Sequence, residues 1–122
     1  METNNYDMNI MVAAGGILSS VSDLAKFAQA HFDNTNEILE LTRKSSFKID
    51  NSIEIGLGWF INTSGVKGFQ HSGGTPGYTS YILIDPKNKN GVIVLSNVSI
   101  LNPDYINTED LCYSLMKTLK KG

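Results

Sequence analysis

The sequence predicts an α+β domain in which helices come first, an antiparallel sheet of three to four strands follows, and a last helix packs against that sheet. Apolar residues recur at spacings of three and four near both ends of the chain, which is the pattern of amphipathic helices. Between these ends, short apolar and β-branched stretches alternate with turn-forming residues. We expect a single domain over 1–122 with a loose lead-in at 1–12, helices within 20–46, the sheet at 53–97 and the last helix at 107–121.

Composition excludes several classes of function. The chain has 122 residues, of which 41% are hydrophobic and 18% charged, and its net charge of -2 provides no basic face for nucleic acid. One cysteine and two histidines cannot supply a disulfide or a zinc site, so we expect no metal and no cofactor. No stretch reads as an export signal or a membrane span, and the compartment is left open.

The first secure element is a helix that begins after Ser20. Ser20 is the expected N-cap, and Asp23 stands three residues later as in a capping box. The helix is expected to stop near Asp33 and Asn34. Its apolar face is formed by Leu24, Phe27, Ala28 and His31.

A shorter helix is predicted from Glu37 to Lys44, with Ile38 and Leu41 facing inward. After it, the stretch from Ile55 to Asn62 reads as one strand, with a bulge or a close contact at one of its two glycines, Gly56 or Gly58.

A β-hairpin is predicted from Thr79 to Leu95. The turn-forming run from Asp85 to Gly91 separates two apolar segments, 79–84 and 92–95. Because residues 92–95 are all apolar, we expect a central strand that is covered on both faces.

The last helix is the expected cover. Asn107 or Thr108 caps it, acidic residues occupy its first turn, and Lys117, Lys120 and Lys121 occupy its last, which suits the helix dipole. Its apolar stripe consists of Leu111, Cys112, Leu115, Met116 and Leu119. Cys112 is therefore interpreted as a small core residue and not as a reactive thiol.

The run from His71 to Tyr78 is the candidate functional stretch. It follows a short predicted strand, Val66–His71, and contains three glycines and a proline. Glycines in a strand allow close approach of a ligand, and unpaired N–H groups there can form an oxyanion hole. The alternative is that residues 73–77 only form a turn between two strands.

Four stretches of the chain stand together in a distinctive order and spacing. They are Ala14–Ser20 with Asp23–Phe27, Gly56–Trp59, His71–Tyr78 and Gly91–Asn97. In register, they resemble the C-terminal part of the serine β-lactamase and penicillin-binding-protein-like hydrolases, in the class C, esterase and D-aminopeptidase branch. The resemblance implies a partial β-lactamase or transpeptidase-like fold.

What the resemblance implies is specific to residues. His71-Ser72-Gly73 stands where such enzymes carry a Lys-Thr-Gly or His-x-Gly triplet, so His71 and Ser72 would position substrate and transfer protons. The N–H of Gly74 would be one of two donors to the oxyanion. Residues expected to contact substrate are Gly73, Thr75 and Tyr78.

The family's nucleophile motif is missing from its expected place. Family members carry Ser-x-x-Lys at a helix start and then Tyr-x-Asn, both before the His-x-Gly strand. About one Ser-x-x-Lys is expected by chance, and Tyr105-Ile106-Asn107 comes too late in the chain, so we interpret all the matches as coincidence. The three Ser-x-x-Lys matches are Ser45/Lys48, Ser64/Lys67 and Ser114/Lys117.

Three hypotheses follow. The chain is a C-terminal hydrolase segment that is inert alone and serves acyl transfer on a lactam, amide or ester when joined by the missing N-terminal part of the fold. Alternatively, it is a binding or dimerisation module that pairs with a second copy or recognises a peptidoglycan-like ligand. A third reading is a small independent esterase that uses Ser72 or Ser45.

Overall fold

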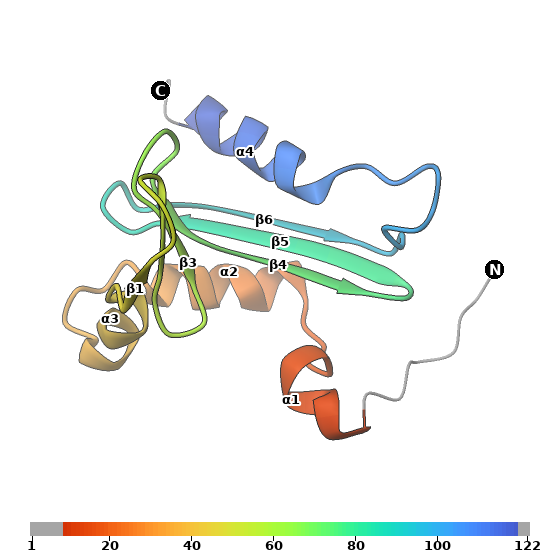
Figure 1. Ribbon diagram of the computed structural model, residues 1–122, viewed down its shortest axis with the longest axis horizontal. Helices are drawn as coiled ribbons and strands as arrows, with labels where there is room; N and C mark the ends of the chain where they lie inside the picture. Colours follow the sequence, from red (N-terminus) through yellow and green to blue (C-terminus); the bar gives the residue numbers. More distant parts are fainter. Residues whose placement is uncertain (1–8, 120–122) are drawn as a thin grey trace.

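A computed structural model describes residues 9–119. Figure 1 shows a layered arrangement in which the long strands lie between α4 on one face and α2 on the other. In chain order the elements are η1 (Asn9–Met11), α1 (Val12–Gly15), α2 (Val21–Ala30), α3 (Glu37–Arg43), β1 (Phe47–Lys48), β2 (Ile53–Ile55), β3 (Phe60–Asn62), β4 (Gly68–Thr75), β5 (Tyr78–Asp85), β6 (Asn90–Ser96) and α4 (Thr108–Leu119). The α+β class and the helix–sheet–helix order are therefore confirmed.

The strands of the described chain form one antiparallel sheet in sequence order, β1 to β6. It has more strands than predicted for two reasons: β1 lies before the expected start of the sheet at residue 53, and the prediction of a single strand over Ile55–Asn62 is wrong. Residues 53–62 instead form a hairpin of β2 and β3, and Gly58 in its loop has a φ of +77° that favours glycine. The close contact expected at Gly56 is present, because a Cβ there would lie 2.5 Å from the carbonyl oxygen of Thr42.

The core lies on both faces of β5, whose side chains alternate between the two helices. Leu83 points toward α4 and Ile84 toward α2, and both are fully buried. Burying one such side chain stabilises a fold by about 1.5–3 kcal/mol. The buried cluster on the α4 side is Tyr81, Leu83, Val92, Cys112 and Met116, and the cluster on the α2 side is Ala28, Trp59 and Ile84.

The apolar segment Val92–Leu95 is covered on both faces at Val92 and Ile93, whereas Leu95 is 38% exposed, and the expected central position of the strand is wrong. β6 is the outermost strand of the sheet, next to β5 only. Val92 packs in the α4-side cluster, and Ile93 packs against the α2-side cluster. Helices on both faces explain the unbroken apolar run without a second neighbouring strand.

The start of α2 matches its prediction. The Ser20 side chain accepts a hydrogen bond from the N–H of Asp23 at 3.2 Å, as an N-cap should. The helix ends at Ala30, before the expected stop. Asp33 follows it in a turn in which its carboxylate accepts hydrogen bonds from the backbone and the hydroxyl of Thr35.

The predicted inward face of α3 is wrong. Ile38 and Leu41 are 77% and 57% exposed, whereas Arg43 is 9% exposed. The Arg43 guanidinium donates to the carbonyl oxygen of His31 and lies 5.7 Å above the centre of the Phe69 ring. This anchor turns α3 so that Ile38 and Leu41 face outward.

The last helix is capped by Asn107, whose side chain accepts from the N–H of Glu109 at 3.0 Å. Cys112 and Met116 are fully buried, which confirms that Cys112 belongs to the core. The rest of the predicted stripe is only partly covered, since Leu111, Leu115 and Leu119 are 40%, 45% and 48% exposed. Lys120 and Lys121 lie outside the described residues.

Candidate active site

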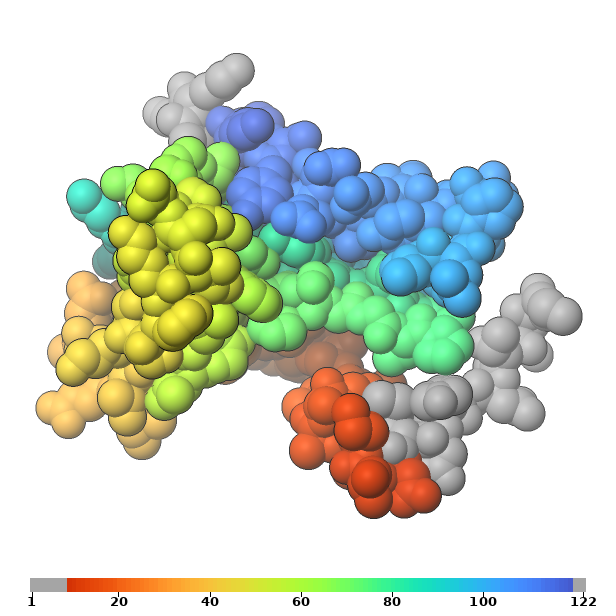
Figure 2. All heavy atoms as spheres, in the orientation of Figure 1, coloured from red at the N-terminus to blue at the C-terminus, as the bar shows by residue number. Residues whose placement is uncertain are grey.

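The glycine run is part of a strand. β4 continues through Gly73 and Gly74 to Thr75, and β5 begins at Tyr78, so the turn consists of Pro76 and Gly77 alone. Residues 73–75 therefore belong to a strand, and the alternative that residues 73–77 only form a turn is wrong. In Figure 2 the surface of β4 and β5, in green, lies between α1, in red, and the segment that follows β6, in blue.

One edge of β4 is open beside the glycines. β3 pairs with β4 only at residues 68–70, and beyond Gln70 that edge has no partner strand in the described chain. Thr75 and Tyr78 flank the two-residue turn as the last pair of the β4–β5 ladder. Because antiparallel strands alternate between residues that bond to the neighbour and residues that face away, the backbone polar groups of Ser72 and Gly74 face the open edge.

The His71 ring contacts one of these edge groups, the carbonyl oxygen of Ser72. Its Nδ1 lies 2.6 Å from the carbonyl oxygen of Ser72. A carbonyl oxygen can only accept, so the proton of this hydrogen bond is on Nδ1. In the neutral ring, Nε2 is then the atom with a free lone pair. The ring also lies beside that of Phe60, with 5.8 Å between the ring centres.

The side chains of His71 and Ser72 lie on opposite faces of the sheet. Ser72 pairs with Tyr81, which belongs to the α4-side cluster, and His71 pairs with Ile82, which packs on the α2 side. His71 and Ser72 are both exposed. One strand therefore presents a different functional group to each face and a line of backbone groups to its edge.

A cavity of about 480 Å³ lies along this strand. The residues predicted as site residues all line it: His71, Ser72, Gly73, Gly74, Thr75 and Tyr78. Its other walls come from the segment that joins α1 to α2 and from β5 and β6, including Leu18, Ser80 and Leu95. Sequence reasoning did not identify these wall residues, because only the packing of distant elements brings them to the strand.

Ser80 explains why Gly73 has no side chain. The two residues pair across β4 and β5, and a Cβ at Gly73 would clash with the Ser80 hydroxyl oxygen. At Gly74, by contrast, the nearest atom to such a Cβ would be Cγ2 of Ile100 at 3.9 Å, an ordinary contact.

A buried polar network supports the strand from the α4 side. The Tyr81 hydroxyl donates to Oε1 of Gln70 at 2.6 Å and lies 3.1 Å from Oε1 of Glu109 on α4. Burial, together with Tyr113 and Glu109, raises the pKa of Tyr81 far above its ordinary value, so this phenol stays protonated. The network links β4 to α4 directly beneath the candidate site.

The Ser-x-x-Lys matches are not placed like a nucleophile motif. Ser45 follows α3 in a loop, Ser64 lies in the β3–β4 loop, and Ser114 lies inside α4. None of these serines starts a helix or lines the cavity beside His71.

Over residues 9–119, no group of three His, Cys, Asp or Glu side chains is arranged to hold a metal ion. No helix in the same range has the length and apolar character needed to cross a membrane.

The chain is similar in sequence to known proteins. Penicillin-binding protein 4* of Bacillus subtilis (strain 168) is 31% identical over 106 residues, which cover 80% of this chain and 23% of that protein. The chain thus spans less than a quarter of the length of this relative. The sequence model of the Beta-lactamase family matches residues 1–111, and the chain therefore belongs to the serine β-lactamase and penicillin-binding-protein-like family.

Proposed function

We propose that this chain is the C-terminal segment of a β-lactamase-like serine hydrolase and that β4 lines its acyl-transfer site. The reaction is the transfer of an acyl group from a lactam, amide or ester. The observation that carries the proposal is the open edge of β4, where the N–H of Gly74 faces away from β5. A strand N–H with no ladder partner can donate to an oxyanion.

Each site residue has a role in this proposal. The N–H of Gly74 is one of two oxyanion donors, and such a donor contributes about 3 kcal/mol of transition-state stabilisation. With its proton on Nδ1 held by the Ser72 carbonyl, His71 offers Nε2 as a proton acceptor, and Ser72 helps to position the substrate. Gly73, Thr75 and Tyr78 contact the substrate along the cavity.

The proposal includes inactivity of the chain alone. Acyl transfer in this family requires a serine nucleophile, and in the described residues no Ser-x-x-Lys serine lines the cavity beside His71. The lone chain should therefore hydrolyse nitrocefin or p-nitrophenyl acetate at background rates. Turnover by the lone chain that survived both His71→Ala and Ser72→Ala would show that the assignment of the site is wrong.

The direct test is a chimera. The matched region of penicillin-binding protein 4* is replaced by this chain, and hydrolysis of an ester or β-lactam substrate is measured. Gly74→Pro removes the N–H that faces the open edge, a position where a proline is tolerated in a strand. Gly74→Ala keeps that N–H and is the matched control, because its Cβ would meet only an ordinary contact.

We expect Gly74→Pro to lower kcat by about 100-fold or more, as loss of one oxyanion donor does, while Gly74→Ala stays near the parent chimera. If Gly74→Pro is as active as Gly74→Ala, the oxyanion role is disproved.

A second candidate function is dimerisation through β6. This outer strand has no partner on its far side in the described chain, and Asn90–Ser96 contains no charged residue or proline to block edge pairing. The partly exposed row Leu111, Leu115 and Leu119 lies on the helix that covers β6. Light scattering distinguishes the candidates, since a folded chain that stays monomeric at high concentration rules out this role.

A further inference from the structure

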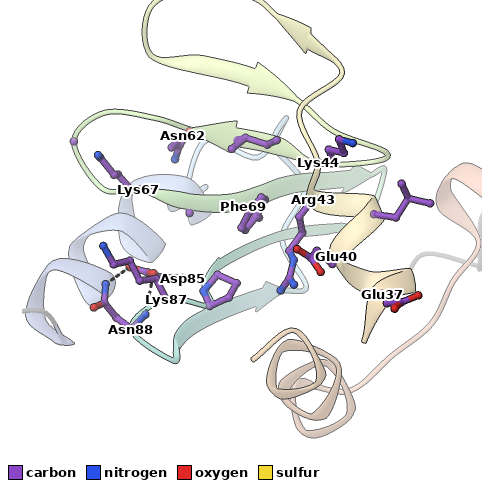
Figure 3. A pocket seen from close by; sticks show the side chains of 15 residues that line it. Glu37, Glu40, Arg43, Lys44, Asn62, Lys67, Phe69, Asp85, Lys87 and Asn88 are labelled. Carbon is purple, nitrogen blue, oxygen red and sulfur yellow. Dashed lines mark hydrogen bonds between the residues drawn. The ribbon is translucent and has the colours of Figure 1, made fainter. Parts of the chain in front are cut away.

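A second cleft lies at the opposite end of β4 from the glycine run. It has a volume of about 950 Å³, within the range of about 300–1,000 Å³ that is typical of small-molecule sites. Figure 3 shows side chains from α3, from the β3–β4 loop and from the β5–β6 loop around it. The residues used below are Arg43, Ile61, Lys67, Phe69, Pro86 and Lys87.

Arg43 is the most informative group in this cleft. Its side chain is 9% exposed, and an arginine keeps its charge at any ordinary pH. Its contacts are the carbonyl oxygen of His31 and the ring of Phe69, both of which are neutral. Within the described chain, no carboxylate lies within ion-pair distance of this guanidinium. A buried charge without a counter-charge is costly, so an anion bound here would be stabilised.

Two lysines add positive charge from separate loops. Lys67 precedes β4 and Lys87 follows β5, and Figure 3 shows both on the side of the cleft opposite α3. Neither forms an ion pair within residues 9–119. The nearby carboxylate of Asp85 already accepts hydrogen bonds from the backbone and the side chain of Asn88.

The α3 side of the cleft also carries two carboxylates, Glu37 and Glu40. They oppose a freely diffusing anion at that side. A bound anion is therefore expected on the side of Arg43 that faces Lys67 and Lys87, away from Glu37 and Glu40.

Between these charges the wall of the cleft is apolar. Phe69, Ile61 and Pro86 line it and are each partly buried. Figure 3 places the Phe69 ring between Lys67 and Arg43. Such a site suits a molecule that has both a flat apolar body and an acidic group.

We propose that this cleft binds small carboxylates that carry an aromatic or apolar body, at a site distinct from the glycine strand. The positive charges of Arg43, Lys67 and Lys87 attract the carboxylate, and the body packs on Phe69.

The test is an NMR titration of the 15N-labelled chain with benzoate, and with benzamide as the uncharged analogue. Benzoate should bind with a Kd of order 1 mM, as expected of a fragment-sized ligand. The amide signals that shift should be those around the cleft, such as Lys67, Phe69 and Lys87. Benzamide should bind about 10-fold more weakly, because it forms no charge-assisted hydrogen bonds.

Two double variants test the role of the lysines. Lys67→Gln with Lys87→Gln should raise the benzoate Kd about 10-fold, the effect of losing charge-assisted contacts. Lys48→Gln with Lys117→Gln changes the net charge equally but lies outside the cleft, and should change that Kd less than about 2-fold. All four lysines are exposed, so folding should be preserved.

Three results would overturn the proposal. One is benzoate and benzamide binding equally well. Another is shifts that map to residues 73–78 instead of the cleft. The third is an equal loss of affinity in the two double variants, which would indicate only nonspecific attraction to net charge. Inorganic phosphate is the further probe: if it binds as well as benzoate, the apolar wall has no part in recognition and the proposed ligand class is wrong.

Discussion

Substitution of Gly73 by alanine tests the packing at the candidate site. A Cβ at Gly73 would lie well inside 3.0 Å of the Ser80 hydroxyl oxygen, closer than side chains approach in real proteins. Either the contact is kept, at a cost of about 1–3 kcal/mol, or Ser80 moves to a poor rotamer that relieves it, at a cost of about 0.5–1.5 kcal/mol. Replacing glycine by alanine at an unstrained position returns about 0.4–1 kcal/mol through the unfolded state. The net destabilisation expected for Gly73→Ala is therefore about 1 kcal/mol.

The clash is confined to one atom, which makes a rescue possible. After the Ser80 hydroxyl, the next atom is the Ser80 Cβ at 3.7 Å, an ordinary contact. Gly73→Ala should therefore cost nothing in a Ser80→Ala background, with a coupling energy of about 1–2 kcal/mol. Gly74→Ala is the control and should be neutral or slightly stabilising, since its nearest contact is 3.9 Å away.

Urea unfolding, followed by the fluorescence of the buried Trp59, measures all these variants. Equal stability of Gly73→Ala and Gly74→Ala, or a failure of Ser80→Ala to rescue the former, would refute this account of the packing.

Three further predictions concern the helices. Ser20→Ala should lower the free energy of unfolding by about 1 kcal/mol through loss of the N-cap of α2, whereas Ser19→Ala should be nearly neutral. Equal effects of the two substitutions in urea unfolding would contradict the role of Ser20 as the N-cap. Burial, together with the nearby Arg43, holds the pKa of His31 below its ordinary value of 6.5. The unfolded chain therefore binds more protons than the folded chain, and the free energy of unfolding should fall as the pH drops below about 6.5. Unfolding curves recorded at several pH values test this, because His31→Leu should flatten the pH dependence. Burial raises the pKa of Cys112 to about 12, so a thiol reagent should label it only after unfolding, and rapid labelling of the folded chain would contradict its core position.

Local signals in the sequence predicted local structure well. Ser20 caps α2 as expected, because an N-cap involves only residues within one turn. The hairpin of β5 and β6 follows from turn formers between two apolar runs. The run from His71 to Tyr78 identified the candidate site, since glycine in a strand is informative in itself.

The errors arise where distant contacts override the local pattern. Ile38 and Leu41 form an apolar helical face, yet α3 turns them outward because Arg43 reaches His31 and Phe69. The four apolar residues of β6 predicted a central strand, but helices on its two faces produce the same pattern at the outer position.

The sequence alone determined the α+β class, the helix cap, the β5–β6 hairpin and the family resemblance. These depend on neighbouring residues or on the order of motifs along the chain. Only the tertiary structure decided that the N–H of Gly74 faces an open edge and that Ser80 excludes a side chain at Gly73. The same holds for the cleft at Arg43, whose walls come from three separate segments. The physical reason is that strand pairing and burial of charge depend on contacts between segments that are distant in the sequence. The spacing of residues along the chain does not specify those contacts.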